Sequence, residues 1–112
     1  MNLGIVGGRD FNNKGQFTIS LNSFMCEHKV NKIITGDANG ADKLAREFAK
    51  DVNIDLIVHK ANWKEYGKAA GAIRNKEIWK DSDVIIAFWD GKSKGTKQTI
   101  DNFKGELIVV RY

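Results

Sequence analysis

Short apolar runs and amphipathic segments alternate along the whole chain. The amphipathic segments space their apolar residues at helical intervals, as Phe17, Leu21 and Phe24 do. The apolar runs are short and rich in Ile, Leu and Val, which is typical of buried strands. The pattern predicts strands at residues 3–7, 31–35, 54–59, 83–89 and 106–111, and helices at 14–28, 39–51, 69–80 and 96–103.

Regular alternation of strands and helices predicts an α/β domain with a parallel sheet covered on both faces. The run Val84–Phe88 is apolar throughout, as expected for a strand that is buried on both sides. We therefore expect a three-layer Rossmann-like fold with five parallel strands in the order 3-2-1-4-5. No repeat or linker interrupts residues 1–112, which predicts a single domain.

Each of the first four predicted strands runs into a polar loop that carries glycine. In a parallel sheet these loops all emerge at the carboxyl edge, where such folds bind ligands. Glycine lets a backbone approach a phosphate closely, and a helix amino terminus offers unpaired N–H groups. The sequence therefore predicts one composite site for a small, phosphorylated ligand, with residues 7–11 and 90–96 on either side of the crevice.

The first loop places Arg9 directly after Gly7 and Gly8, and Phe11 follows closely. An arginine at the end of a strand could clamp a phosphate through two hydrogen bonds. The alternative is a tight turn with a surface arginine. The loop matches neither the dinucleotide fingerprint nor the Walker phosphate loop, so we expect no cofactor.

The second loop is bracketed by Gly36 and Gly40 and opens onto the second helix. Ala41 is small enough for close packing or for close approach of a ligand. Asp42 lies in the first turn of the helix, where it could simply stabilise the helix dipole. Asp37 could instead accept hydrogen bonds from ribose hydroxyls, and the sequence leaves both alternatives open.

The fourth loop resembles a phosphate cradle, because it carries glycines and hydroxyls at the start of a predicted helix. Its candidate residues are Asp90, Gly91, Ser93, Gly95 and Thr96. The alternative is a flexible, lysine-rich hairpin tip, which the helical segment that follows makes less favourable.

Trp63 and Trp89 stand at loop or strand-end positions, where an indole could stack on a base or belong to the core. Arg74 and Asn75 are expected to begin the exposed side of the third helix, near the same edge, as a second phosphate contact. His28 and His59 lack the spacing of metal ligands, so no metal site is predicted.

The chain carries 18 Lys and Arg against 14 Asp and Glu, a net charge of +4. The basic residues are scattered among acidic ones, which favours a mixed solvated surface over a nucleic-acid interface. No apolar run reaches the roughly 20 residues of a membrane span, and no signal peptide is evident. The single cysteine, Cys26, is expected to pack, and we expect a cytoplasmic protein.

Taken together, these loops resemble the SLOG superfamily and in particular its small YspA/YpsA-related branch. The resemblance implies a nucleotide-derived ligand, because relatives either sense or cleave such molecules, and it allows a homodimer. It covers almost the whole chain and rests on residues 7–11, 35–42, 61–63, 66–75 and 88–96.

The enzymatic relatives are phosphoribohydrolases that release a base from its ribotide. The resemblance aligns their helical arginine with Arg74 and puts Thr99 where they have a catalytic glutamate. A threonine cannot do the work of a carboxylate, although Asp101 lies nearby as a weak substitute. We therefore expect ligand binding or sensing. The alternatives are hydrolysis of a nucleotide's N-glycosidic bond and single-stranded nucleic-acid binding of the DprA type.

Overall fold

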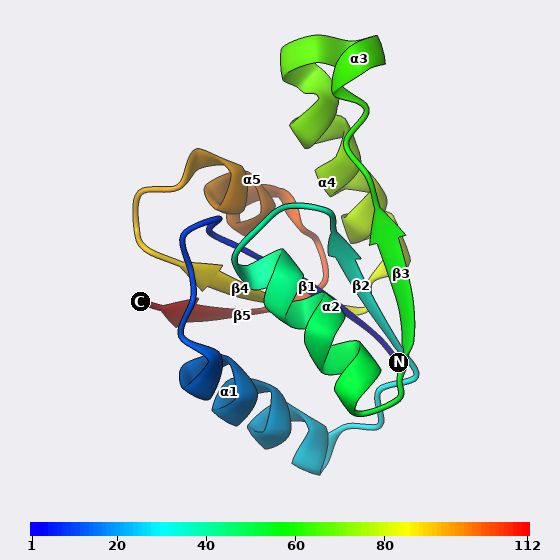
Figure 1. Ribbon diagram of the computed structural model, residues 1–112, viewed down its shortest axis with the longest axis vertical. Helices are drawn as coiled ribbons and strands as arrows, with labels where there is room; N and C mark the ends of the chain where they lie inside the picture. The colour runs from blue at the N-terminus through cyan, green and yellow to red at the C-terminus, as the bar shows by residue number, and fades with distance from the viewer.

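Five parallel strands form one sheet in the order β3-β2-β1-β4-β5 (Figure 1). The computed structural model describes residues 1–112. Each neighbouring pair is in parallel register, and β1 pairs with β2 on one side and with β4 on the other. The strands are β1 Asn2–Gly7, β2 Lys32–Gly36, β3 Asp55–His59, β4 Val84–Trp89 and β5 Glu106–Arg111.

Helices cover both faces of the sheet. The first pair of helices, α1 and α2, packs on one face, and the second pair, α4 and α5, packs on the other. A short α3 with a 3₁₀ turn after it lies beyond the end of the sheet (Figure 1). The bounds are α1 Lys14–Glu27, α2 Ala41–Asp51, α3 Trp63–Tyr66, η1 Gly67–Ala69, α4 Ala70–Asp81 and α5 Lys94–Asn102.

The core has two parts, one on each face, because successive side chains of a strand point to opposite sides. Ile5 of β1 belongs to the larger cluster under α1 and α2, while its neighbour Val6 belongs to the smaller cluster under α4 and α5. Phe17 of α1 stacks on Phe88 of β4, with 5.1 Å between ring centroids. Both faces of the central strands are thus buried, which explains their continuous apolar runs.

The predicted fold class and strand order are confirmed. The boundaries differ locally: α5 begins at Lys94, two residues before the predicted start. Residues 60–68, the connection between the predicted strand and the predicted helix, include α3, because the Asn62 side chain caps it by accepting a hydrogen bond from the Glu65 N–H at 3.1 Å. Cys26 was expected to pack, but it is exposed, since it falls on the solvent side of α1.

None of the helices combines the length and the apolar character that crossing a lipid bilayer requires.

Candidate functional site

A cavity of about 460 Å³ opens at the carboxyl end of β1, between α4 and α5. Segments from four parts of the chain line it, which is the arrangement expected at the point where the strand order reverses. The lining residues are Val6, Gly7, Gly8, Arg9, Asp10, Ala38, Asp42, Trp63, Gly71, Ala72, Arg74, Asn75, Ile78, Ser93, Gly95, Thr96, Gln98 and Thr99.

The first two loops are locked together beneath this cavity. The Ala41 N–H donates to the Gly8 carbonyl at 3.2 Å. Gly40 has a φ of 73°, and a Cβ at this position would overlap the Gly8 carbonyl oxygen. Gly7 is equally confined, since its Cβ would lie 2.6 Å from the Ala41 side chain. These glycines therefore allow two backbones to approach each other.

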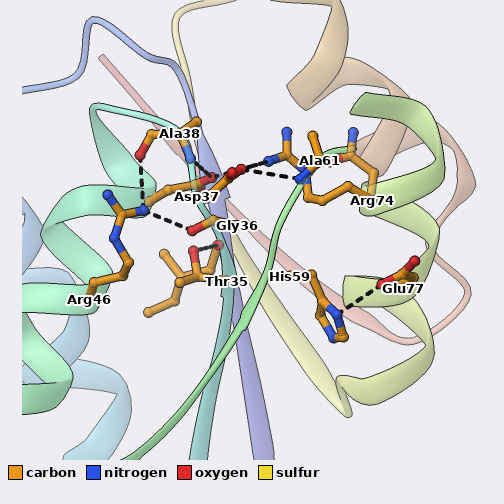
Figure 2. Close-up of polar contacts among 12 residues, drawn as sticks. Thr35, Gly36, Asp37, Ala38, Arg46, His59, Ala61, Arg74 and Glu77 are labelled. Carbon is orange, nitrogen blue, oxygen red and sulfur yellow. Dashed lines mark hydrogen bonds and ion pairs between the residues drawn. The ribbon is translucent and has the colours of Figure 1, made fainter. Parts of the chain in front are cut away.

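Arg74 reaches from α4 into a cluster of acidic residues at the end of β2 (Figure 2). Its Nη1 lies 3.0 Å from Asp37 Oδ1 and 4.0 Å from Asp42 Oδ2, while its Nε donates to Asn75 Oδ1 at 3.1 Å. Arg74 and Asn75 were predicted on the exposed side of the helix, but only 9% and 8% of their surfaces are accessible. The ion pairs with two carboxylates compensate the burial of the guanidinium.

Asp42 is the buried carboxyl of this cluster, with 5% of its surface exposed. Burial raises the pKa of Asp42, and Arg74 together with the Ala38 N–H, 3.3 Å away, works in the opposite direction. Arg46 of α2 donates to the carbonyls of Gly36 at 2.8 Å and Ala38 at 3.0 Å (Figure 2). These hydrogen bonds thus fix the conformation of the loop between β2 and α2.

The amino end of α5 opens onto the other wall of the cavity. Ser93 stands at the N-cap, but its side chain does not cap the helix; its hydroxyl donates to Thr96 Oγ1 at 3.4 Å. No protein group accepts a hydrogen bond from the N–H groups of Lys94, Gly95 and Thr96. A Cβ at Gly95 would meet no atom within 4 Å. The open space beside Gly95 therefore adjoins unpaired donors.

Three predicted site residues shape this loop without lining the cavity. Asp90 Oδ1 accepts from the N–H groups of Lys92 and Ser93, each at 2.8 Å. The Trp89 indole N–H donates to the Ser93 carbonyl at 3.0 Å, and Gly91 has a φ of 87°. Hydrogen bonds from Ser93 and Lys92 lower the pKa of Asp90. The hydrogen bonds from Trp89 and to Asp90 thus fix the position of Ser93.

The remaining predicted residues divide between the core and the mouth of the cavity. Phe11 packs in the core, 4.8 Å from Phe88 between ring centroids. Trp63 is 49% exposed at the mouth, with the Arg9 guanidinium 5.9 Å from the centre of its ring. Gly36, Asp37, Gly40 and Ala41 support the cavity from below, and Asp37 lines a smaller neighbouring cavity with Arg74.

The predicted residues that do line the cavity come from all four loops, and their contact with a ligand stays a prediction. They are Gly8, Arg9, Asp42, Trp63, Arg74, Asn75, Ser93, Gly95 and Thr96. Sequence reasoning missed Gln98 as a lining residue, although it follows Gly95 at helical spacing. Thr99 was placed only through the resemblance, and Asp10 was included in the first loop without being named as a site residue.

Thr99 and Asp101 lie in very different surroundings. Thr99 lines the cavity, is 1% exposed and accepts a hydrogen bond from the Trp79 indole at 2.9 Å. Asp101 is on the outside of α5, paired with Lys97 at 2.7 Å. The position aligned with the catalytic glutamate therefore faces the cavity, whereas the nearby carboxylate of Asp101 does not line it.

His59 belongs to a polar contact on the far side of α4. Its two ring nitrogens lie 3.0 Å from Glu77 and 2.6 Å from Asp81 (Figure 2 shows the Glu77 contact). His28 stacks on Phe24. No group of three His, Cys, Asp or Glu side chains is arranged to hold a metal ion.

Comparison with known proteins supports the resemblance seen in the loops. Gene 61 protein of Mycobacterium phage D29 is 37% identical over 71 residues, which cover 58% of this chain and 57% of that protein. The chain thus spans little more than half of this relative's length. No solved structure matches it. Residues 2–66 match the model of the family described as YspA, cpYpsA-related SLOG. Because this match includes more than half of its residues, the chain belongs to that family.

Proposed function

We propose that this protein binds a nucleotide or an ADP-ribose-like ligand in the cavity between α4 and α5. The observation that carries the proposal is the open amino end of α5. The N–H groups of Lys94, Gly95 and Thr96 have no partner in the protein, and a Cβ at Gly95 would meet no neighbouring atom within 4 Å. Unpaired N–H groups at a helix amino terminus attract anions, and phosphate is the anion that nucleotides present.

Arg74 is the second group suited to an anionic ligand. Two of its nitrogens are engaged by Asn75 and Asp37, while its second terminal nitrogen has no partner in the protein. A guanidinium held in one position by side-chain contacts is prepared to bind a phosphate oxygen without further ordering. The Asn75 amide donates to Gln98 at 3.2 Å and so connects α4, which carries Arg74, to α5.

Trp63 is the group suited to the base. Its ring lines the cavity mouth and is half exposed, and Arg9 lies over it. Exposed indole rings stack on bases with a gain of about 1–3 kcal/mol. The cavity volume of about 460 Å³ falls in the range of about 300–1,000 Å³ that is common for small-molecule sites.

The experiment that tests the proposal compares substitutions at two glycines, each of which is the second residue of its helix. Gly95→Val fills the space in front of the α5 amino end, whereas Gly15→Val makes the same change in α1, away from the cavity. Calorimetry with AMP and with ADP-ribose should show at least about tenfold weaker binding for Gly95→Val and unchanged binding for Gly15→Val.

Native mass spectrometry of the freshly purified protein complements this comparison, because it detects a nucleotide that co-purifies. If neither AMP nor ADP-ribose binds the unmodified protein and no nucleotide co-purifies, the proposal fails. Equal affinities of Gly95→Val and the unmodified protein would instead exclude the α5 amino end as the phosphate site.

A second candidate function is hydrolysis of a nucleotide's N-glycosidic bond, and Asp42 is the observation that favours it. This carboxyl is buried in the cavity wall, and burial raises its pKa. A carboxyl with a raised pKa in a cleft is a candidate general acid. It would have to replace the glutamate that is absent at Thr99.

Chromatography of AMP incubated with the protein tests this alternative, since hydrolysis releases free adenine. Under the hydrolase hypothesis, the unmodified protein releases adenine above the background of Arg74→Ala, and Asp42→Asn abolishes the release. Absence of free base from a preparation that binds AMP would leave binding as the function.

A further inference from the structure

Asp10 lines the same cavity as the buried Asp42, but its carboxylate is exposed. Its Oδ1 accepts a hydrogen bond from the Tyr112 hydroxyl at 2.6 Å, across 102 positions of the chain. No protein group donates to its Oδ2. One oxygen of this carboxylate is therefore fixed, and the other is available to a ligand.

The Tyr112 side chain is held in turn by its surroundings. The backbone N–H of Tyr112 donates to the Trp89 carbonyl at 3.1 Å, and the centroid of its ring lies 4.6 Å from that of Phe11. Gly8 makes room for the contact, since a Cβ there would overlap the Tyr112 hydroxyl and lie 2.8 Å from Asp10 Oδ1. A tyrosine hydroxyl is protonated at neutral pH and can donate; partial burial and the hydrogen bond to Asp10 raise the pKa of Tyr112 further. The end of β5 thus positions Asp10.

A carboxylate repels a phosphate and accepts hydrogen bonds only, so the ligand must present donors to Asp10. Its two oxygens suit two adjacent donors. Ribose offers such a pair in its 2′- and 3′-hydroxyls. The Watson–Crick edge of adenine does not, because it sets an acceptor nitrogen beside its amino group, whereas guanine offers two donors.

We propose that Asp10, positioned by Tyr112, recognises a pair of adjacent hydrogen-bond donors on the ligand, and that this pair is the ribose diol. This inference rests on the proposed nucleotide binding. It assigns separate ends of the cavity to separate parts of the ligand. The α5 amino end and Arg74 take the phosphate, and Asp10 takes the sugar.

The test measures calorimetric affinities for AMP, 2′,3′-dideoxy-AMP and GMP. The unmodified protein should bind AMP about tenfold to a hundredfold more tightly than the dideoxy analogue, as expected for hydrogen bonds to a charged group. Asp10→Ala should bind both equally. Asp55→Ala, which removes an exposed carboxylate at the opposite edge of the sheet, should keep the full discrimination.

Tyr112→Phe separates positioning from stability, because it keeps the ring against Phe11 and removes only the hydroxyl. We expect this variant to lose part of the discrimination with little change in its melting temperature. Equal binding of AMP and the dideoxy analogue by the unmodified protein would overturn the diol assignment. A preference for GMP over AMP that disappears in Asp10→Ala would show that Asp10 contacts guanine and not the ribose diol. If no nucleotide binds at all, the proposed function fails first, and this inference falls with it.

Discussion

Two loops at the carboxyl edge of the sheet carry the same residue types and use them differently. The Gly36 loop (residues 36–40) follows β2, and the Asp90 loop (residues 90–93) follows β4. Glycines in and near the Gly36 loop are surrounded by protein atoms, since a Cβ at Gly36 or Gly40 would overlap neighbours. Gly95, just after the Asp90 loop, faces open space. Within the Asp90 loop Gly91 is confined as well, by the Arg111 side chain, so among these glycines only Gly95 leaves room for a ligand.

The carboxylates beside these loops show the same contrast. Asp42 and Asp90 both accept hydrogen bonds from backbone N–H groups. Burial nevertheless raises the pKa of Asp42, whereas hydrogen bonds from Ser93 and Lys92 lower the pKa of the only partly covered Asp90. Solvent exposure, and not the local motif, therefore decides the direction of the shift.

The largest expected effect comes from Gly40→Ala. Its φ of 73° strains any side chain, at a cost of about 1–3 kcal/mol, and the added Cβ would also overlap the Gly8 carbonyl. We expect a loss of about 3 kcal/mol or more in the free energy of unfolding, measured by urea denaturation. Gly67→Ala is the control, because Gly67 has a φ of 56° but no neighbour within 4 Å. Equal losses in both variants would show that the contact between the two loops contributes nothing.

Gly36→Ala should have a smaller effect on stability and a clear effect on ligand binding. The new Cβ would lie 2.5 Å from Asp42 Oδ2 and 2.7 Å from Arg74 Nη1, so both side chains must move. Overpacking of this kind costs about 1–3 kcal/mol. We expect a loss in the lower half of this range, with AMP affinity reduced because Arg74 is displaced. Unchanged AMP affinity would indicate that the position of Arg74 does not matter for binding.

The fold was predictable because the alternation of short apolar runs with amphipathic segments permits few arrangements. Parallel strands need crossover helices, and right-handed crossovers leave few strand orders, of which the observed 3-2-1-4-5 is a common one. Much of the cavity wall was predictable for the same reason. Once the strands are placed, Arg9, Ser93 and Gly95 must emerge at one edge.

What the sequence could not predict depends on contacts between distant residues. Arginine is ordinarily exposed, and Arg74 is buried where Asp37, which is 37 positions away, and Asp42 meet its guanidinium. Asp10 is held at the cavity by a hydrogen bond from the hydroxyl of Tyr112, which is 102 positions away. Likewise, no local pattern distinguishes Gly36, whose neighbours fill the space, from Gly95, whose neighbours leave it open.

Asp42→Asn tests the buried carboxylate by its pH dependence. Because burial raises the pKa of Asp42 above 3.8, the folded state binds a proton more tightly than the unfolded state. Asp42 therefore contributes a stability that is complete at low pH and is lost as pH rises from 3.8 through the folded-state pKa. The asparagine cannot titrate, so the stability of Asp42→Asn relative to the unmodified protein should improve as pH rises. Urea denaturation between pH 3.5 and pH 8 measures this difference, and a constant difference would mean that Asp42 titrates normally.

The smallest expected effect comes from Asp90→Ala, and its pH dependence should have the opposite sign. The N–H groups of Ser93 and Lys92 lower the pKa of Asp90, so its contribution is present above 3.8 and is lost as pH falls through the lower folded-state pKa. Asp90 is only partly covered, so solvent weakens its hydrogen bonds, and we expect a slight destabilisation at neutral pH that vanishes in acid. The same denaturation series measures it. Calorimetry should also show weaker AMP binding, because the released loop no longer fixes Ser93 at the start of α5. If Asp90→Ala and Asp42→Asn shifted with pH in the same direction, solvent exposure would not be what separates the two loops.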